Sequence, residues 1–124
     1  MADAARHLRL GESGEELAAA FLRKQGLAVV DRRVRFARGE LDIVARNGRE
    51  WVFVEVKTRS SSRMGSAVEA MTRVKSRRMG RAVREYVARH RLHDAPMRCD
   101  LVAIDVGTDG KFHISHYPGA IIPD

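Results

Sequence analysis

The chain has 124 residues, of which 44% are apolar, enough for one domain with a packed core. Its net charge is +7, and the excess is carried by arginine, with 19 Arg against 4 Lys. Cys99 is the single cysteine, which excludes an intramolecular disulfide and a zinc cage built from cysteines. No apolar run approaches the roughly eighteen residues of a membrane span, and the first residues carry no apolar signal segment. We therefore expect a cytoplasmic protein that does not enter a membrane.

The first predicted element is a helix that begins at a capping box and ends at a glycine. Ser13 and Glu16 have the spacing of the box, and Gly26 follows Gln25, the last residue expected in the helix. One face of this helix carries Leu17, Ala18, Phe21 and Leu22.

The rest of the chain mixes strand and helix signals. They predict a strand over 27–31, an arginine-rich edge strand or loop over 32–38, a hairpin over 39–59, a helix over 67–90, and strands over 97–106 and 111–117. This order predicts one α/β domain over residues 1–124, with a central mixed sheet flanked by helices.

The second predicted helix has an apolar and a basic face. Its apolar positions are Val74, Met79, Ala82, Val83, Tyr86 and Val87, and its outer positions include Arg73, Lys75, Arg77, Arg78, Arg81 and Arg84. A one-sided basic stripe suits a row of phosphates, because the guanidinium fork matches phosphate oxygens. We therefore expect Lys75 and Arg78 to contact nucleic acid, although the same composition also suits an ordinary solvated surface.

The hairpin over 39–59 sorts its charged residues. Asn47-Gly48 predicts a two-residue turn, which would pair Val44 with Trp51 and Glu40 with Glu55. One face would then hold Glu40, Asp42, Val44, Trp51, Phe53, Glu55 and Lys57, and the other Leu41, Ile43, Ala45, Val52, Val54 and Val56. A three-residue turn would instead place Asp42 and Glu55 on opposite faces.

The charged face has the parts of a metal-dependent hydrolytic site. Asp42 and Glu55 would be diagonal neighbours with Cα atoms roughly 7–8 Å apart, so that both carboxylates reach one ion. Such hard oxygen ligands suit Mg²⁺ or Mn²⁺, and Lys57 on the same side can orient water and a phosphate oxygen. The alternative is a salt-bridge cluster on an exposed face.

Other residues near the hairpin have simpler roles. Thr58 and Arg59 flank the charged residues. If the site hydrolyses nucleic acid, these two residues are expected to touch the strand beside it. Trp51 and Phe53 are expected to pack beneath a helix. We expect His113 and His116 on the surface, since residues three apart in a strand face opposite ways.

Several segments together resemble a known family. They are "GESGEELAAAFLRKQG" (11–26), "GELDIVA" (39–45), "VFVEVKTR" (52–59), "RMGSAVEAMTRVKSRRM" (63–79) and "RCDLVAIDV" (98–106). The two hairpin segments resemble the PD-(D/E)xK nucleases, and nearly the whole chain resembles the YraN-like family of small bacterial proteins, which are similar to archaeal Holliday-junction resolvases. This chain has Asp31-Arg32 where the family usually has Asn-Arg, and Cys99 where it usually has Phe.

The resemblance implies a restriction-endonuclease-like fold and a magnesium- or manganese-dependent active site. It implies catalytic roles for Asp42, Glu55 and Lys57, with the two carboxylates as metal ligands. It adds Glu15 of the first helix as a further acidic residue. Nucleases similar to this chain often act as homodimers, so a dimer is also expected.

Two functions follow from these residues. The first is a metal-dependent endonuclease that hydrolyses phosphodiester bonds of nucleic acid, with DNA, including branched DNA, as the expected substrate. The alternative is a catalytically silent module that keeps the nuclease fold and binds nucleic acid. A protein-interaction scaffold is a third hypothesis, which predicts no affinity for nucleic acid at moderate salt.

Overall fold

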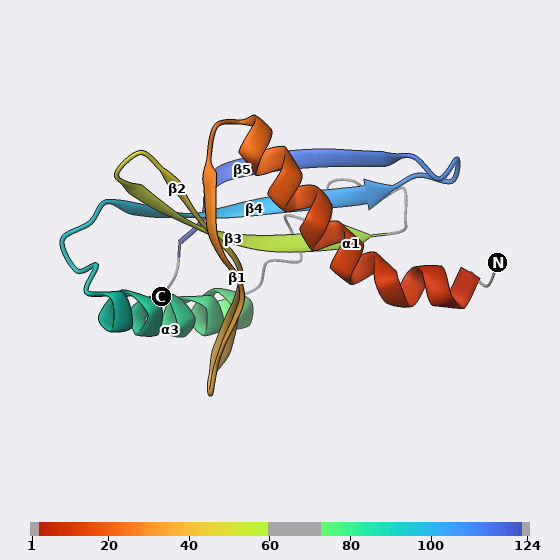
Figure 1. Ribbon diagram of the computed structural model, residues 1–124. Coiled ribbons are helices and arrows are strands. Elements are labelled where there is room, and N and C mark those ends of the chain that lie inside the picture. The colour runs from red at the N-terminus through yellow and green to blue at the C-terminus, as the bar shows by residue number, and fades with distance from the viewer. Residues whose placement is uncertain (1–2, 60–72, 123–124) are drawn as a thin grey trace.

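Two helices cover opposite faces of a five-stranded mixed sheet in the computed structural model (Figure 1). The structure describes residues 3–59 and 73–122, and only the backbone of residues 3–13 and 73–76. The elements are α1 (Asp3–Lys24), β1 (Ala28–Phe36), β2 (Gly39–Asn47), β3 (Glu50–Arg59), α3 (Arg73–His90), β4 (Met97–Val106) and β5 (Phe112–Ile121). Within the described part of the chain, neither helix is long and apolar enough to cross a membrane.

The strands lie in chain order, β1-β2-β3-β4-β5. Neighbouring strands are antiparallel except for β3 and β4, which are parallel and have α3 between them in the chain. Parallel neighbours need a crossover connection, which a helix usually supplies. The predicted α/β architecture with a mixed sheet is confirmed.

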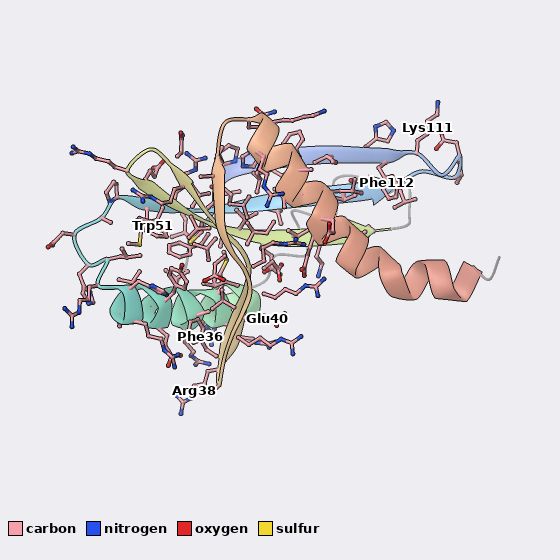
Figure 2. All side chains as sticks on the ribbon, in the orientation of Figure 1. Phe36, Arg38, Glu40, Trp51, Lys111 and Phe112 are labelled. Carbon is pink, nitrogen blue, oxygen red and sulfur yellow. The ribbon has the colours of Figure 1, made fainter. Side chains whose placement is uncertain are left out.

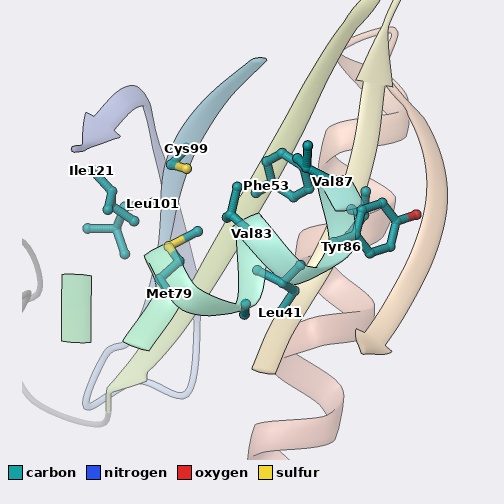
Figure 3. Close-up of a cluster of buried hydrophobic side chains, with 11 residues drawn as sticks. Leu41, Phe53, Met79, Val83, Tyr86, Val87, Cys99, Leu101 and Ile121 are labelled. Atoms are coloured by element: carbon teal, nitrogen blue, oxygen red, sulfur yellow. The ribbon is translucent and has the colours of Figure 1, made fainter. Parts of the chain in front are cut away.

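Each helix buries a separate apolar cluster against the sheet. Beneath α1 the cluster consists of Ala18, Ala19, Leu22, Leu27, Ile43, Ala45, Val52, Val54, Val102 and Ile104. Beneath α3 it includes Leu41, Phe53, Met79, Val83, Tyr86, Val87, Cys99, Leu101 and Ile121 (Figure 3). The apolar face predicted for α3 is confirmed from Met79 onward, and Phe53 and Trp51 pack beneath this helix as expected.

Helix α1 begins earlier than its capping box predicts. It starts at Asp3, so Ser13 lies inside the helix and the predicted start is wrong. Residues 3–12 are rich in Ala, Leu and Arg, which favour a helix and extend it beyond the box. Its end is as predicted, because Gly26 has a φ of 93° and Leu27 N–H donates to the Leu22 carbonyl at 3.0 Å.

The arginine-rich segment after α1 continues the first strand. Residues 28–36 form the single edge strand β1, which has an irregularity in its pairing with β2 between Val29 and Asp31. The structure thus resolves the alternatives for residues 32–38 in favour of an edge strand up to Phe36. The predicted helical segment 67–72 lies outside the described residues.

The β2–β3 hairpin forms with a register different from the predicted one. Asn47 pairs with Glu50 and Val44 with Phe53, so Gly48-Arg49 is the loop. Gly48 has a φ of 64°, and a type II′ turn needs its glycine at the first central position, which moves the turn one residue along the chain. Val44 thus pairs two positions further along β3 than predicted, with Phe53 instead of Trp51. Because faces alternate every two residues, a shift of two leaves the same β3 residues on each face.

The faces of β2 do not alternate throughout. Leu41 packs beneath α3 together with Val44, whereas it was predicted to share the opposite face with Ile43. The β2–β3 pairs end at Ile43, and from there β2 continues along β1 only. Once β2 leaves β3 it is free to twist, and Leu41 turns toward α3.

The last two strands contain a buried polar network. Strand β4 has the predicted bounds, while β5 extends to Ile121. Asp100 is fully buried and accepts hydrogen bonds from Arg98 Nε at 3.0 Å and Gly119 N at 2.8 Å. His116 Nε2 lies 2.7 Å from Asp100 Oδ2, and its side chain is only 13% exposed, so the surface position predicted for His116 is wrong. His113 is exposed as predicted.

Candidate active site

The candidate site lies where β2 and β3 separate. Asp42 and Glu55 are the next residues after the last paired ones, Ile43 and Val54. The N–H of Val56 in β3 donates to Asp42 Oδ2 at 2.8 Å. The Asp42 carboxylate therefore takes the place of a strand partner for β3 at the point where the β2–β3 pairing ends. Figure 1 shows the two strands diverging beyond this point.

Asp42 is a buried acid surrounded by other acids. Its pKa is raised from 3.8 to about 7, first by burial and then by the charge of Glu55, whereas the hydrogen bond from Val56 acts in the opposite direction. Glu15 also raises the pKa of Asp42, so the three predicted acidic residues come together in space. Two or more carboxylates in one place repel unless a proton or a cation lies among them.

Glu15 reaches this point because α1 lies very close to β3. A Cβ atom at Gly14 would collide with the Thr58 hydroxyl and lie 3.7 Å from Ile104, so only glycine fits there. Glu15 follows Gly14 directly, and its carboxylate pairs with Arg33 Nε at 2.6 Å. The close approach of helix and sheet thus positions the third acid.

Arg33 is held in an unusual backbone conformation next to the site. Its φ is 51°, and it lies across from Asp42, between the pairs Arg32–Ile43 and Val34–Leu41. A left-handed conformation costs about 1–2 kcal/mol for a residue with a Cβ. Such strained residues gather at functional sites, where the surrounding structure maintains them.

Glu55 faces α3 and opens to solvent there. It lines a hollow of about 220 Å³ together with Glu40, Arg78 and Met79. Arg78 was expected from the sequence to contact nucleic acid. It lines the same hollow as Glu55, one of the two predicted metal ligands. Glu40 is exposed and forms an ion pair with Arg35 at 3.6 Å.

The remaining predicted residues divide between the two faces of β3. Lys57 and Arg59 alternate with Thr58 along the strand, are half-buried, and share the face of Glu55. Thr58 lies on the other face, against Gly14 beneath α1. Lys75 belongs to α3, but its side chain lies outside the described residues.

The acids of this site fit a hard divalent cation in part. Among the described residues, no three His, Cys, Asp or Glu side chains are close enough to hold a metal by themselves. Mg²⁺ is typically bound through one or two carboxylates, with water and substrate phosphate completing its shell. Asp42 and Glu55 would supply those carboxylates. The pKa of Asp42 is raised by burial first and then by the negative charge of Glu55 and Glu15, which a cation would offset.

Comparison with known proteins places the chain in a family. The family described as "Uncharacterised protein family UPF0102" matches residues 14–104, which include α1 from Gly14 onward and the strands of the site. The chain belongs to the UPF0102 family. The YraN-like resemblance stated from the sequence is thereby confirmed.

Individual UPF0102 proteins match over most of their length. The UPF0102 protein of Shewanella sediminis is 45% identical over 97 residues, which cover 78% of this chain and 82% of the relative. The UPF0102 protein of Symbiobacterium thermophilum is 45% identical over 103 residues, covering 83% and 87%. That of Syntrophotalea carbinolica is 43% identical over 117 residues and covers 94% of each chain.

Two features of this UPF0102 site were not predicted from the sequence. Arg33 pairs with Glu15, but arginine carries no signal for a positive φ. The hollow joining Glu55 to Arg78 depends on how α3 packs against the sheet, which local patterns do not specify. The turn glycine Gly48 was the one available signal for the true hairpin register.

Proposed function

We propose that this UPF0102 protein is a metal-dependent endonuclease that hydrolyses phosphodiester bonds of nucleic acid. DNA is the expected substrate, and branched DNA is the form to test first. The fold is consistent with a restriction-endonuclease-like domain, and the resemblance to PD-(D/E)xK nucleases supports the reaction class.

The observation that carries the proposal is the gathering of acids around Asp42. The ionised Asp42 carboxyl is buried next to Glu55 and Glu15, and a bound cation or a proton would relieve the repulsion among these acids. Buried acids with raised pKa values of this kind gather at functional sites. Mg²⁺ or Mn²⁺ held by Asp42 and Glu55 would offset charge on the phosphate and make water a better nucleophile.

The protein's own groups have distinct roles in this proposal. Asp42 keeps its orientation through the Val56 N–H, which donates to one carboxylate oxygen, and its side chain also shares a hydrogen bond with Glu55, the other proposed ligand. Lys57, on the face of Glu55, would orient water and stabilise negative charge on a phosphate oxygen. Glu15 adds negative charge to the cation site, and its pair with Arg33 holds it near Asp42.

A cleavage panel with matched lysine variants tests the proposal. Purified protein is incubated with labelled single strands, duplexes and four-way junctions in Mg²⁺, Mn²⁺ or EDTA. Wild type is expected to cut at least one substrate with metal only, Lys57→Ala to lose the activity, and Lys111→Ala, on the exposed β4–β5 turn, to keep it. Absence of cleavage of every substrate by wild type would refute the endonuclease.

The silent binding module is a second candidate, favoured by the pair between Glu15 and Arg33. At 2.6 Å this pair commits the Glu15 charge to an arginine and leaves less of it for a cation. The module predicts salt-sensitive binding of nucleic acid that Glu55→Gln leaves unchanged, with no turnover. Metal-dependent turnover that is lost in Glu55→Gln would exclude it.

A further inference from the structure

A basic groove runs between the β1–β2 turn and α3. Two adjoining hollows of about 420 and 490 Å³ share the turn residues Phe36 to Gly39 on one wall and Arg81 on the other. Figure 2 shows Arg38 at the tip of the turn, with Phe36 beside α3. The turn lies so close to the helix that a Cβ atom added at Gly39 would be 2.6 Å from the Arg78 carbonyl oxygen.

Arginines from both walls face this groove. Arg35 and Arg38 belong to the turn side, while Arg78, Arg81 and Arg84 belong to α3. Within the described part of the chain, no carboxylate lies within ion-pairing distance of Arg38, Arg78 or Arg81.

The two acids of the groove are already paired with arginines. Glu40 pairs with Arg35 at 3.6 Å, and Glu85 pairs with Arg89 at 3.7 Å. Arg89 in turn lies over the Phe36 ring at 5.1 Å, which keeps it beside the groove. The groove therefore has a net positive charge that acids within it do not cancel.

The groove is continuous with the candidate active site. Glu40 and Arg78 line both the larger hollow of the groove and the hollow that contains Glu55. Arg81 lies one helical turn beyond Arg78 on α3, a rise of about 4.5 Å, so the cations extend outward from Glu55 in a row. A row of cations leading away from a hydrolytic site matches a chain of phosphates better than a single anion.

We propose that this groove binds the sugar-phosphate backbone of the nucleic acid next to the bond that is cut. Arg38 on one wall and Arg81 on the other would contact successive phosphates of one strand, with Arg78 nearest the site. The inference rests on the proposed nuclease function for its substrate class. It adds Arg38, which no sequence motif indicated, and it assigns Arg81 of the basic stripe to a wall of this groove.

The salt dependence of DNA binding tests the groove. Binding of a labelled duplex and a labelled four-way junction is measured by fluorescence anisotropy in EDTA at several salt concentrations. The double variant Arg38→Gln/Arg81→Gln is compared with Arg23→Gln/Arg49→Gln, which removes two exposed arginines from the end of α1 and the β2–β3 turn. Thermal unfolding of both variants confirms that they are folded.

The expected result is a selective loss in the groove variant. The slope of log K against log salt is negative, and each lost phosphate contact makes it shallower by about 0.9. The slope should therefore be shallower by about 2 in the groove variant, and its affinity at 100 mM salt weaker by roughly tenfold or more. The control variant keeps its slope within about 0.5 of wild type. Three results would each contradict DNA binding by the groove. They are equal losses in the two variants, displacement of the DNA by polyglutamate at equal charge, and no DNA binding by wild type.

This test distinguishes the proposal that the groove binds DNA from the proposal that the protein is a nuclease. Binding is measured without metal, whereas the nuclease requires turnover with metal. A selective slope change together with a wild type that never cleaves would retain the groove and reject the endonuclease. Cleavage by wild type with equal slopes in both variants would retain the endonuclease and reject the groove.

Discussion

Replacing Asp42 by asparagine is predicted to make the metal-free protein more stable at alkaline pH. Asparagine has nearly the same shape, and its side-chain oxygen can still accept the hydrogen bond from Val56 N–H. The change removes a negative charge that burial, Glu55 and Glu15 all disfavour in the folded protein.

The pKa of Asp42 sets the size and the pH range of this effect. It rises from 3.8 to about 7 on folding, so between these values the folded protein holds a proton that the unfolded chain has lost. Stability therefore falls as pH rises through this window, and the full cost is present above pH ~7. At about 1.4 kcal/mol per pH unit, the cost relieved by asparagine is at most about 4 kcal/mol, or on the order of 10 °C in Tm for a domain of this size.

Thermal unfolding in EDTA from pH 4.5 to 8.5 measures the effect. The difference in Tm between Asp42→Asn and wild type should grow with pH and level off above pH ~7. Glu40→Gln is the control, because it removes a negative charge from the same strand at an exposed position, and its difference should change little with pH. A Tm difference for Asp42→Asn that is constant with pH, or that shrinks as pH rises, would show that the Asp42 charge does not destabilise the folded protein.

Three further predictions concern metal binding, the contact of α1 with the sheet, and the polar network of β4. Mn²⁺ should raise the Tm of wild type at pH 8 and not that of Glu55→Gln, and equal shifts in differential scanning fluorimetry would contradict a role of this carboxylate in holding the ion. Gly14→Ala should lower stability by about 1–3 kcal/mol, and Thr58→Ala in the same chain should restore most of it, since the added methyl collides with the Thr58 hydroxyl; additive losses in chemical denaturation would argue against the collision. Asp100→Ala should cost about 3–5 kcal/mol, because it leaves the buried partners of a charged network without their acceptor; a loss below about 1 kcal/mol would show that the network contributes little.

Much of the candidate site could be predicted because strand alternation is a strong constraint. Asp42 and Glu55 are brought together by a two-residue hairpin. The predicted register was wrong, but it was wrong by two positions, so the two residues still meet. Glu15 was found through family resemblance, and the structure adds the physical reason, which is the close packing of Gly14 on β3.

The remaining features depend on tertiary packing. The twist that turns Leu41 toward α3 begins where β2 loses its partner strand, and no local pattern marks that point. The long helix α1 overrode the capping signal at Ser13, since helix-forming residues on both sides of a cap allow the helix to continue. The burial of His116 depends on Asp100 in the neighbouring strand, which a reading of β5 alone does not include.

In the proposed reaction Asp42 binds a divalent cation that supports phosphodiester hydrolysis. Multiple-turnover cleavage of a labelled four-way junction at pH 8 in Mg²⁺, by wild type, Asp42→Asn and the exposed control Asp94→Asn, tests it most directly. We expect metal-dependent cleavage by wild type and by Asp94→Asn, and a loss of about a hundredfold or more in Asp42→Asn, which still folds. Equal rates in wild type and Asp42→Asn would contradict it.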